Sequence, residues 1–543
     1  MLKSVSKSNA DSDGFVGEDS SLRPNEPNRS NDSFSVCRKL INIDKKDVCF
    51  ELEVNQNGFK NTAIFTRDDV FSQSSNVINF GIPYFSKKTD WINFISSIEE
   101  SIPISYCHNT LGFYKINEQL VFKADCAIGI ESVYFGNFDV FSKGSYDEWH
   151  SGMKKCVMQT LPLQFMLLLG LSAVTIGFLG DSVDGSLLVH IYSDSSKGKT
   201  TGSALAISTA GNPSSNTKKN SLQLDYGDTY NYRIASLSGN NGVPMVIDEA
   251  SMISTRDISS FVYACCNGQS KGRLSSDGSQ KEVYHWKTCC ISNGEGSLLP
   301  YCNNNQGIRA RLIEIQFDSI TESAKQAEEI KEVINNNYGW ANKIYAQYII
   351  DNQEEVINVF EQFAETINQE IASNPLASRL SRKLSVIVTT SYCAKKALKL
   401  DFDVNGIKDI LLNAINNQQE EESLDLCKRV VEFLVTDTVT HKEHYNLKLS
   451  NINYDLFPNN CYGFYNNFLK DKTHTEICYF PDQFKKLLEQ GGFTNPAVCL
   501  KALQKDGYLV VDNDGHIKIK RRINGVTTRV YVIRFPVEII SRQ

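Results

Sequence analysis

The sequence predicts an α/β protein whose core is a parallel sheet carrying a phosphate-binding loop (P-loop). A β-rich N-terminal domain is expected before this core, and a helical lid and a winged helix after it. Three observations carry the prediction. Apolar runs alternate with helix-like segments over residues 146–320, which is typical of parallel strands joined by crossover helices. A Gly-Lys-Thr sequence at residues 198–200 follows one of these runs after a short turn. The last part of the chain reads as two short helices followed by a hairpin.

Changes of composition along the 543 residues indicate five segments. The first is rich in Ser, Asn, Asp and Gly and is expected to be a disordered tail. The second has short alternating runs such as "VCFELEV" and predicts a small, mainly β domain with one or two helices. The fourth carries Ile, Leu, Ala, Glu and Lys at helical spacing. The segments are the tail at 1–34, the β-rich domain at 35–145, the sheet core at 146–320, the helical lid or linker at 321–450 and the winged helix at 451–543.

Charge and cysteine content narrow the class of protein. A net charge of -7 argues against a chain that coats nucleic acid with its whole surface, but it is compatible with a local basic face. The 15 cysteines are scattered without a C-x-x-C pair, so we expect reduced thiols in a cytoplasmic protein. His441 and His444 have H-x-x-H spacing, but we expect no cysteine or acidic partner at ligand distance in the sequence. No metal centre is therefore predicted at these histidines.

One stretch is nearly long and apolar enough to cross a membrane. Residues 161–179, "LPLQFMLLLGLSAVTIGFL", carry no charge but include a proline, a glutamine and several small residues. The alternatives are a membrane anchor and a helix buried inside a large domain. The Gly-Lys-Thr sequence follows shortly afterwards, so we favour the buried helix. The first residues lack an apolar signal core, and we expect a cytoplasmic protein without a membrane partner.

The Gly-Lys-Thr sequence indicates a nucleotide site. Core strands are expected at 186–192, 243–248, 286–291 and 310–317. The first enters a small-residue turn, and the helix-like "TTGSALAISTA" leaves it, which is the local structure that cradles a triphosphate on backbone amides. The standard pattern G-x-x-x-x-G-K-[ST] has glycine where this chain has Ser193, and serine there would cost about 1–2 kcal/mol if a left-handed conformation were required. The residues expected to bind ATP here are Ser193, Ser195, Ser196, Lys197, Gly198, Lys199, Thr200 and Thr201.

Individual roles follow from the chemistry of each side chain. Lys199 is the point charge for the β- and γ-phosphates, and the Thr200 hydroxyl is a ligand for Mg²⁺. About fifty residues later, "GVPMVIDEAS" is an apolar strand that ends in two acids. Asp248 is expected to hold Mg²⁺ through water, and Glu249 to polarise the attacking water. The alternative is a strand end capped by two acids, which is common by itself but unusual at this distance after a P-loop.

Two further elements complete the predicted catalytic set. The strand "WKTCCISNGEGS" ends in polar residues, of which Asn293, and after it Ser292, are candidates to contact the water and the γ-phosphate. A simple turn residue is the equally weighted alternative for Asn293. Arg309 and Arg311 alternate with apolar residues as they enter the next strand, so we expect them on the same side of it. Either could act as an arginine finger, and the alternative is a surface pair at a strand end.

With these elements in order, the chain resembles the ATPase/helicase family filed as domain of unknown function 927 (DUF927). The resemblance rests on "HNTLGFYKINEQLVF", "DSSKGKTT", "VIDEAS", "YACCNGQSKGRLSSDG", "WKTCCISNGEGSL" and "NQGIRARL", and it covers roughly residues 40–320. Members of the family usually carry glycine where Ser193 stands. The resemblance implies an AAA+ core related to the replicative ring helicases of plasmids, archaea and mobile elements, with ATP and Mg²⁺ bound between the subunits of a homo-oligomer.

The same resemblance implies further contacts. Residues 268–273 could form a hairpin that lines a ring pore, with Lys271 and Arg273 on the phosphates of single-stranded DNA, and a solvated loop is the alternative. A sensor arginine for the nucleotide is expected from the helical lid, either Arg382 or Arg379. The arginine finger, Arg309 or Arg311, would act on the nucleotide of a neighbouring subunit.

The C-terminal segment can be read from its own chemistry. Helices are expected at 481–490 and from Asn495-Pro496 to about 506, then a strand in "GYLVV", then two strands joined by Asn524-Gly525. From residue 480 onward the chain has 11 basic and 6 acidic residues, a balance opposite in sign to that of the whole chain. Duplex DNA binding is favoured over protein docking. The wing residues expected on DNA phosphates are Lys518, Lys520, Arg521, Arg522 and Arg529.

These observations together predict an ATP-dependent DNA helicase or translocase that forms a ring, expected to be a hexamer. Its pathway would be replication of a bacterial mobile genetic element or phage. Single-stranded DNA would occupy the pore, and duplex DNA the winged helix. One alternative is a nucleotide-gated DNA-binding initiator or defence protein without unwinding activity. Another is a scaffolding protein that retains the ATPase fold only.

Overall fold

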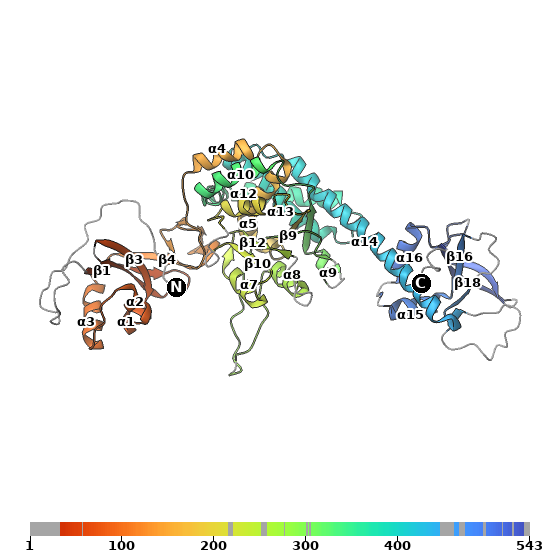
Figure 1. Ribbon diagram of the computed structural model, residues 1–543, viewed down its shortest axis with the longest axis horizontal. Coiled ribbons are helices and arrows are strands. Elements are labelled where there is room, and N and C mark those ends of the chain that lie inside the picture. Colours follow the sequence, from red (N-terminus) through yellow and green to blue (C-terminus); the bar gives the residue numbers. More distant parts are fainter. Residues whose placement is uncertain are drawn as a thin grey trace. The chain divides into compact units, whose positions relative to one another are not determined.

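The computed structural model describes two compact units, Met1–Ala414 and Ile415–Gln543, and each is considered by itself (Figure 1). The described residues are 33–536 except 57, 215–220, 251–257, 276, 300–301, 303–305, 446–460, 466–472, 492, 494–495, 513 and 524–525. The tail expected to be disordered therefore lies almost wholly outside the described residues.

The chain begins with a small sheet of order β3-β2-β1-β4-β8 that is covered by three short helices. Alternating side chains of β2, such as Phe50 and Leu52, pack against Trp91 and Ile95 of the third helix. The sequence analysis expected one or two helices in this region. The elements are β1 (Ser33–Asn42), β2 (Val48–Gln56), β3 (Phe59–Thr66), α1 (Arg67–Ser72), α2 (Ser75–Phe80), α3 (Lys88–Glu99), β4 (Ile104–His108) and β8 (Val133–Tyr134).

A second sheet, of order β11-β5-β6-β7, ties this region to the core. Its strands are β5 (Leu111–Ile116), β6 (Gln119–Lys123), β7 (Ala127–Ile128) and β11 (Asn240–Asn241). The last of these comes from within the core segment and pairs with β5 in parallel. The two backbones approach so closely at Gly112, which has φ of 86°, that a Cβ atom there would lie 1.9 Å from the carbonyl oxygen of Asn241.

The core is an all-parallel five-stranded sheet of order β10-β12-β13-β9-β14. Three of its strands match the expected positions, whereas β13 begins three residues later than expected and the short edge strand β10 was not expected at all. The strands are β9 (Leu187–Tyr192), β10 (Gln223–Asp225), β12 (Met245–Asp248), β13 (Cys289–Gly294) and β14 (Leu312–Gln316). The connecting helices are α6 (Lys199–Ser208), α7 (Tyr230–Leu237), α8 (Ile258–Asn267) and α9 (Gln306–Arg309).

The long apolar helix α5 (Leu161–Leu179) lies inside the first unit. It contacts β13 of the sheet as well as α6, α11 (Ala341–Asp351) and α13 (Ala377–Leu398). By length and composition it could cross a membrane, but 78% of its most apolar window is buried by the protein itself. The structure therefore supports the buried helix over the membrane anchor.

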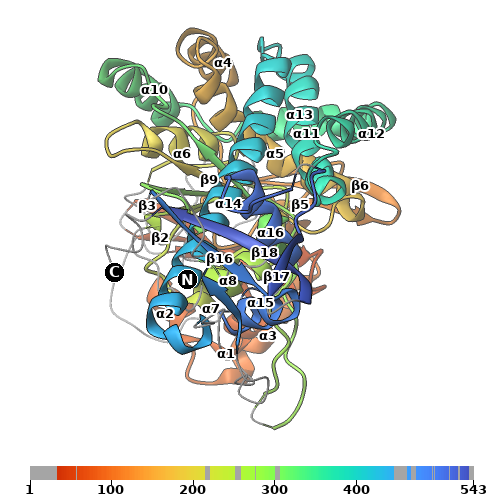
Figure 2. The same cartoon turned by 90° about the vertical axis from the view of Figure 1, so that its right-hand side faces the viewer.

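A helical segment follows the sheet, as the spacing of apolar residues predicted. Of its helices, α11 and α13 pack against α5, α12 packs against α13, and α10 packs against α6 and the earlier helix α4 (Figure 2). The elements are α4 (Tyr146–Cys156), α10 (Ala324–Asn336), α11 (Ala341–Asp351), α12 (Gln353–Glu370), α13 (Ala377–Leu398) and α14 (Val404–Thr440).

The second unit combines the end of α14 with two helices and a four-stranded sheet of order β15-β16-β18-β17. Its core includes Val430 and Leu434 of α14, so the unit begins before the expected boundary at 451. The helix expected at 481–490 is present with those bounds. The expected strand in "GYLVV" contributes only an isolated bridge from Leu509 to Ile533 of β18, and β16, which was not expected, pairs with the other side of β18. The elements are η4 (Lys442–Tyr445), β15 (Gly463–Tyr465), β16 (His474–Tyr479), α15 (Pro481–Gln490), α16 (Pro496–Lys505), β17 (Ile519–Ile523) and β18 (Val526–Pro536).

Candidate nucleotide-binding site and DNA-binding surfaces

The register of the parallel sheet brings three polar strand ends to one edge. Ile247 of β12 pairs with Ser292 of β13, and Ser292 pairs with His190 of β9. One residue further along each strand, Asp248 and Asn293 therefore stand at the same level, just before the loop that leaves β9. The carboxyl edge of a parallel sheet is where such folds bind their ligands.

The loop between β9 and α6 has an open helix N-terminus. Gly198 is the N-cap of α6, and as a glycine it has no side chain to hydrogen-bond the first turn. The backbone amides of this turn are thus left for an anion, and the helix dipole favours one. A Cβ atom at Gly198 would lie 2.5 Å from the Thr321 hydroxyl, so only glycine fits at this point of the loop.

Lys199 closes the loop on itself. Its ammonium group donates hydrogen bonds of 2.7 Å to the carbonyl oxygens of both Ser193 and Asp194. Burial lowers the pKa of Lys199, while the carboxylates of Glu295, Asp194 and Asp248 oppose that shift. The lysine is therefore held against the carbonyl oxygens at the start of the loop.

The backbone strain of the loop falls on Ser196 and not on Ser193. Ser196 has φ of 62° and Gly198 has φ of 85°, whereas Ser193 does not adopt a left-handed conformation. The buried Ser193 donates from its amide to the Gly294 carbonyl oxygen at 3.4 Å. The cost that a left-handed conformation would impose on serine at position 193 does not arise, because the chain turns three residues later.

The two acids at the end of β12 have different surroundings. Asp248 accepts hydrogen bonds from Gln223 Nε2 at 2.9 Å and from the amide of Glu249 at 2.8 Å, so its carboxylate is fixed. Glu249 is exposed and has φ of 57°, a left-handed conformation that costs a non-glycine residue about 1–3 kcal/mol. Such strain persists only where the surrounding structure holds it, and it clusters at functional sites.

Neighbouring residues of β13 point in opposite directions. Asn293 is buried and donates from Nδ2 to the Ser203 hydroxyl of α6 at 2.9 Å, which places its amide beside the helix that follows the P-loop. The Ser292 hydroxyl lies within 2.8 Å of both His190 Nδ1 and the Tyr226 hydroxyl, on the other face of the sheet. Ser292 is fully buried there, so the interpretation of Ser292 as a phosphate contact is wrong.

The two candidate finger arginines lie at the opposite edge of the sheet. Arg309 ends α9, and Arg311 lies in the turn before β14, so the expectation that they alternate along a strand is wrong. Arg311 donates to Asn267 Oδ1 at 3.1 Å and to the Gly307 carbonyl oxygen at 2.9 Å, and it stacks over the Tyr263 ring. Because β14 runs parallel to the six-residue β9, this edge is roughly 20 Å from the P-loop.

The expected sensor arginine Arg382 does not reach the P-loop of its own chain. Arg382 forms a bidentate pair with Glu361 and donates to the Ser182 carbonyl oxygen at 2.7 Å, and Ser182 precedes the amino end of β9. Arg382 therefore lies away from the P-loop of its own chain, and the sensor role expected for it stays a prediction. The alternative, Arg379, lines a cavity of about 340 Å³ at the same edge together with Arg311 and Lys383. Lys383 is only 3% exposed, and sequence reasoning did not single it out.

Comparison with known families agrees with these motifs. Residues 15–285 match the family model described as "Domain of unknown function (DUF927)". The chain is a DUF927 protein. Residues 425–538 match a second model, described as "Cch helix turn helix domain". No protein with a curated description matches the chain.

A solved structure resembles this DUF927 protein over nearly its whole length. Its title is "SCCmec type IV Cch - active helicase", and the match has a TM-score of 0.67 at 23% sequence identity. It covers 94% of this chain and 95% of the other. The chain therefore has a helicase-like fold: a parallel sheet, a β-rich N-terminal region, a helical segment and a C-terminal helix-turn-helix.

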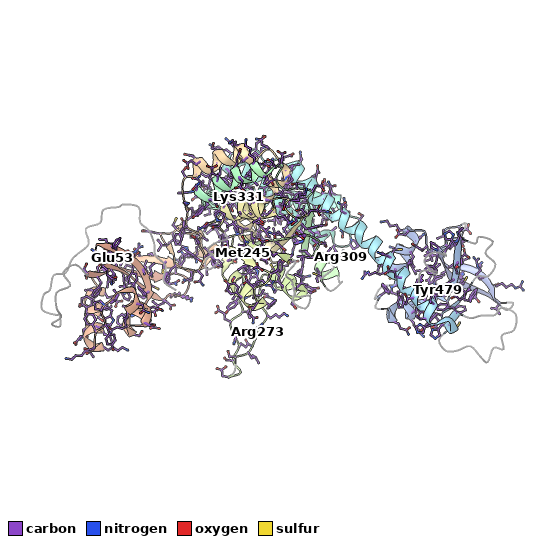
Figure 3. All side chains as sticks on the ribbon, viewed as in Figure 1. Glu53, Met245, Arg273, Arg309, Lys331 and Tyr479 are labelled. Atoms are coloured by element: carbon purple, nitrogen blue, oxygen red, sulfur yellow. The ribbon has the colours of Figure 1, made fainter. Side chains whose placement is uncertain are left out.

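A hairpin projects from the DUF927 core between α8 and β13. The amide of Ser270 donates to the Tyr284 carbonyl oxygen at 2.9 Å, and Leu274 forms a bridge with Gln280. Arg273, labelled in Figure 3, donates to Asn231 Oδ1 of α7 at 2.7 Å. Lys271 is exposed and lies 3.3 Å from the Ser260 hydroxyl. Both candidate DNA contacts are thus at the base of the hairpin, against α7 and α8.

The wing of the helix-turn-helix unit separates its cations onto two faces. Lys520 pairs directly with Arg529 across β17 and β18, and these two and Arg522 are exposed on one face. Arg521 lies on the other face and interacts with the buried thiol of Cys478. Lys518 stands over the Tyr531 ring at 5.8 Å. The turn at Asn524-Gly525 lies outside the described residues.

Proposed function

We propose that this protein is an ATP-dependent DNA helicase or translocase that works as a ring on the DNA of a bacterial mobile element or phage. The observation that carries the proposal is the division of the polar residues between the two edges of the core sheet. The P-loop, Asp248 and Asn293 share the carboxyl edge, while Arg311, Arg379 and Lys383 share the amino edge.

The carboxyl edge has the donor set that a magnesium triphosphate needs. The uncapped N-terminus of α6 and the ammonium group of Lys199 would hold the phosphates. On nucleotide binding, Lys199 would exchange its hydrogen bonds to the loop carbonyl oxygens for contacts with the phosphates. Mg²⁺ would be held by the Thr200 hydroxyl and, through water, by Asp248, and it would neutralise charge on the phosphates. Glu249 would orient and polarise the attacking water, and Asn293 would fix it against the γ-phosphate.

The amino edge offers the complementary positive charge. Among the described residues Arg311 has neutral hydrogen-bond partners. The cavity lining holds three cations, Arg311, Arg379 and Lys383, and one carboxylate, that of Asp184, so its net charge is positive. A distance of roughly 20 Å prevents these groups from serving the P-loop of their own chain. In a homo-oligomer, the amino edge of one sheet would face the carboxyl edge of the sheet in the next subunit, and Arg311 would reach the nucleotide bound there. We expect this homo-oligomer to be a hexameric ring.

Two surfaces would contact DNA. Lys271 and Arg273 on the hairpin would meet the phosphates of a single strand in the pore, and the exposed cations of the wing would meet a duplex. These are phosphate contacts, which position the DNA without reading its sequence. The family match to a helix-turn-helix domain supports a role for the second unit on DNA.

The test is ATP hydrolysis with and without single-stranded DNA. Wild type is expected to hydrolyse ATP faster with DNA, whereas Lys199→Ala loses binding and Glu249→Gln binds ATP but hydrolyses it at least 10²-fold more slowly. A mixture of Lys199→Ala and Arg311→Ala is expected to regain part of the activity. Some interfaces then combine the intact P-loop of an Arg311→Ala subunit with the intact Arg311 of a Lys199→Ala neighbour. Wild-type activity no greater than that of Glu249→Gln would overturn the enzyme proposal, and a mixture without recovery would overturn the ring arrangement.

The second candidate is a DNA-binding initiator or defence protein that uses nucleotide only as a switch. The closed position of Lys199, satisfied by its own loop, favours this candidate because nucleotide must displace two hydrogen bonds to enter. Forked DNA separates the two. A helicase releases the displaced strand in proportion to the ATP consumed, whereas a switch changes its affinity for DNA and leaves the strands paired.

A further inference from the structure

We propose that Asp437, His441 and His444 form a binding site for a divalent transition-metal ion, with Zn²⁺ as the best match. The three residues follow the spacing i, i+4, i+7 at the end of α14, which brings them to one side of the chain. One ligand atom from each lies within 4.8 Å of the other two. None of them belongs to the nucleotide site or to the cations of the wing.

The acidic ligand is buried and held in place. Asp437 has a side chain that is 10% exposed, and its two oxygens have separate partners. Oδ1 lies 2.9 Å from His441 Nδ1, and Oδ2 accepts a short hydrogen bond from the Tyr445 hydroxyl. Carboxylates that bind metals are typically fixed by a second group in this way, so Tyr445 would orient the ligand without touching the ion.

The two imidazoles are arranged together beside this carboxylate. The rings of His441 and His444 are nearly parallel, with an interplanar angle of 14° and centroids 5.4 Å apart. The amide of His444 donates to the His441 carbonyl oxygen at 2.9 Å, which fixes the turn that joins them. Both rings therefore face the same small volume next to Asp437.

The ligand set selects the metal. Two imidazoles and one carboxylate suit Zn²⁺, Co²⁺ or Ni²⁺, with a fourth position left for water, whereas Mg²⁺ prefers oxygen ligands only. The Mg²⁺ that accompanies ATP would therefore not compete for this site. A cation here would also lie at the carboxyl end of α14, where the helix dipole favours positive charge.

A second cluster, Asp512, Asp514 and His516, also passes the distance criterion but has a simpler explanation. The Asp512 carboxylate accepts the amides of Asp514 at 3.1 Å and of His516 at 2.8 Å, which is what closes an exposed turn. Because none of its residues is buried, in contrast to Asp437, this cluster serves as the control.

The bound ion would connect α14 to the sheet of the second unit. His444 accepts a hydrogen bond from the amide of Tyr462 at 3.2 Å, and Tyr445 packs edge-on against Tyr479, labelled in Figure 3, at 5.8 Å. A metal on Asp437, His441 and His444 would fix the end of the helix against this aromatic cluster. We therefore expect it to stabilise the helix-turn-helix unit and to leave the nucleotide site unchanged.

The test is titration of the full-length, untagged, EDTA-treated protein with ZnCl₂ by isothermal titration calorimetry. Wild type is expected to bind one equivalent, unaffected by millimolar Mg²⁺. Asp437→Asn and His441→Gln are each expected to weaken binding at least 10-fold, and His516→Gln to leave it unchanged. Circular dichroism without zinc checks that the variants fold, and a zinc-dependent rise in the unfolding midpoint should appear in wild type and His516→Gln only.

Three results would overturn the proposal. They are the absence of saturable zinc binding to folded wild type, equal binding by wild type and folded Asp437→Asn or His441→Gln, and loss of binding in His516→Gln instead.

Discussion

Asn293 Nδ2 donates a 2.9 Å hydrogen bond to the Ser203 hydroxyl and so joins the tip of β13 to the first turns of α6. A strand tip and the helix after the P-loop are thereby held at a fixed separation. Movement of either element on nucleotide binding or hydrolysis would be transmitted to the other through this contact.

Replacement of Asn293 should affect catalysis more than binding. Asn293→Ala is expected to lower kcat for ATP hydrolysis by about 10²-fold, because one preorganised donor at the reacting phosphate is lost. The Kd for a fluorescent ATP analogue should change by less than about threefold, since the P-loop is untouched. Ser292→Ala is the matched control: it should lower stability by about 1 kcal/mol and leave kcat unchanged. Equal losses of kcat in both variants would contradict a role for Asn293 at the nucleotide.

The serine at the first P-loop position should be close to neutral. Ser193→Gly is expected to change the Kd for ATP by less than about twofold, because no left-handed conformation is required at that position. Ser196→Val is expected to weaken ATP binding by about 10-fold or more, since a β-branched residue tolerates φ of 62° poorly. Fluorescence titration measures both. A large gain in affinity for Ser193→Gly would mean that the loop rearranges to a left-handed conformation at this residue when nucleotide binds.

The wing offers a test of DNA contact by salt dependence. In the triple variant Lys520→Gln, Arg522→Gln, Arg529→Gln, the slope of log K against log salt should fall by about 3, because each phosphate contact contributes about 0.9. Arg521→Gln should change the slope by less than about 1, since Arg521 lies on the opposite face of the hairpin. Fluorescence anisotropy with a labelled duplex at several salt concentrations gives both slopes. Similar slopes for the triple variant and Arg521→Gln would remove the wing from the DNA interface.

Stability should fall as the pH is lowered through the ordinary histidine range. Burial lowers the pKa of His190 to about 4 and that of His108 to about 4, from an ordinary value near 6.5. Between these values the unfolded chain binds protons that the folded chain does not, so the free energy of unfolding decreases as pH decreases from 6.5 toward 4. Each histidine contributes a slope of up to about 1.4 kcal/mol per pH unit.

Urea unfolding at several pH values checks this expectation. His190→Gln should lose about half of the pH dependence that the two histidines supply, whereas replacement of the exposed His516 should preserve all of it. An unchanged slope in His190→Gln would mean that burial does not lower the pKa of His190 and that the ring is protonated in the folded protein over this pH range.

The sequence predicted those parts of the site that depend on local pattern. An apolar strand, a small-residue turn and a helix identify the loop around Lys199, and an apolar strand ending in acids identifies Asp248. The parallel order of the sheet could be expected from the alternation of strands and helices. The short β10 could not, because three residues at a sheet edge carry too little pattern to be recognised.

What the sequence could not provide is the direction and reach of side chains between distant segments. Gln223, which fixes Asp248, lies 25 residues earlier in a strand that was not recognised. The partners of Arg382 are Glu361 of α12 and Ser182 before β9, which are too distant in the sequence to be predicted from the residues around Arg382. Asp437 lies one helical turn before His441, but this pairing depends on α14 continuing as a helix to this point, which the local sequence does not establish.

The position of Arg311 at the amino edge of the sheet has a consequence for the control of ATP hydrolysis. A solitary copy would contain both halves of a catalytic centre, but at opposite ends, and would leave ATP intact. If the proposed arrangement holds, turnover begins only when copies associate, so specific activity should rise with protein concentration. A mobile element that carries this gene could then maintain a low level of the protein in its host without consuming ATP. ATP hydrolysis would begin when expression rises or when several copies assemble on the DNA of the element.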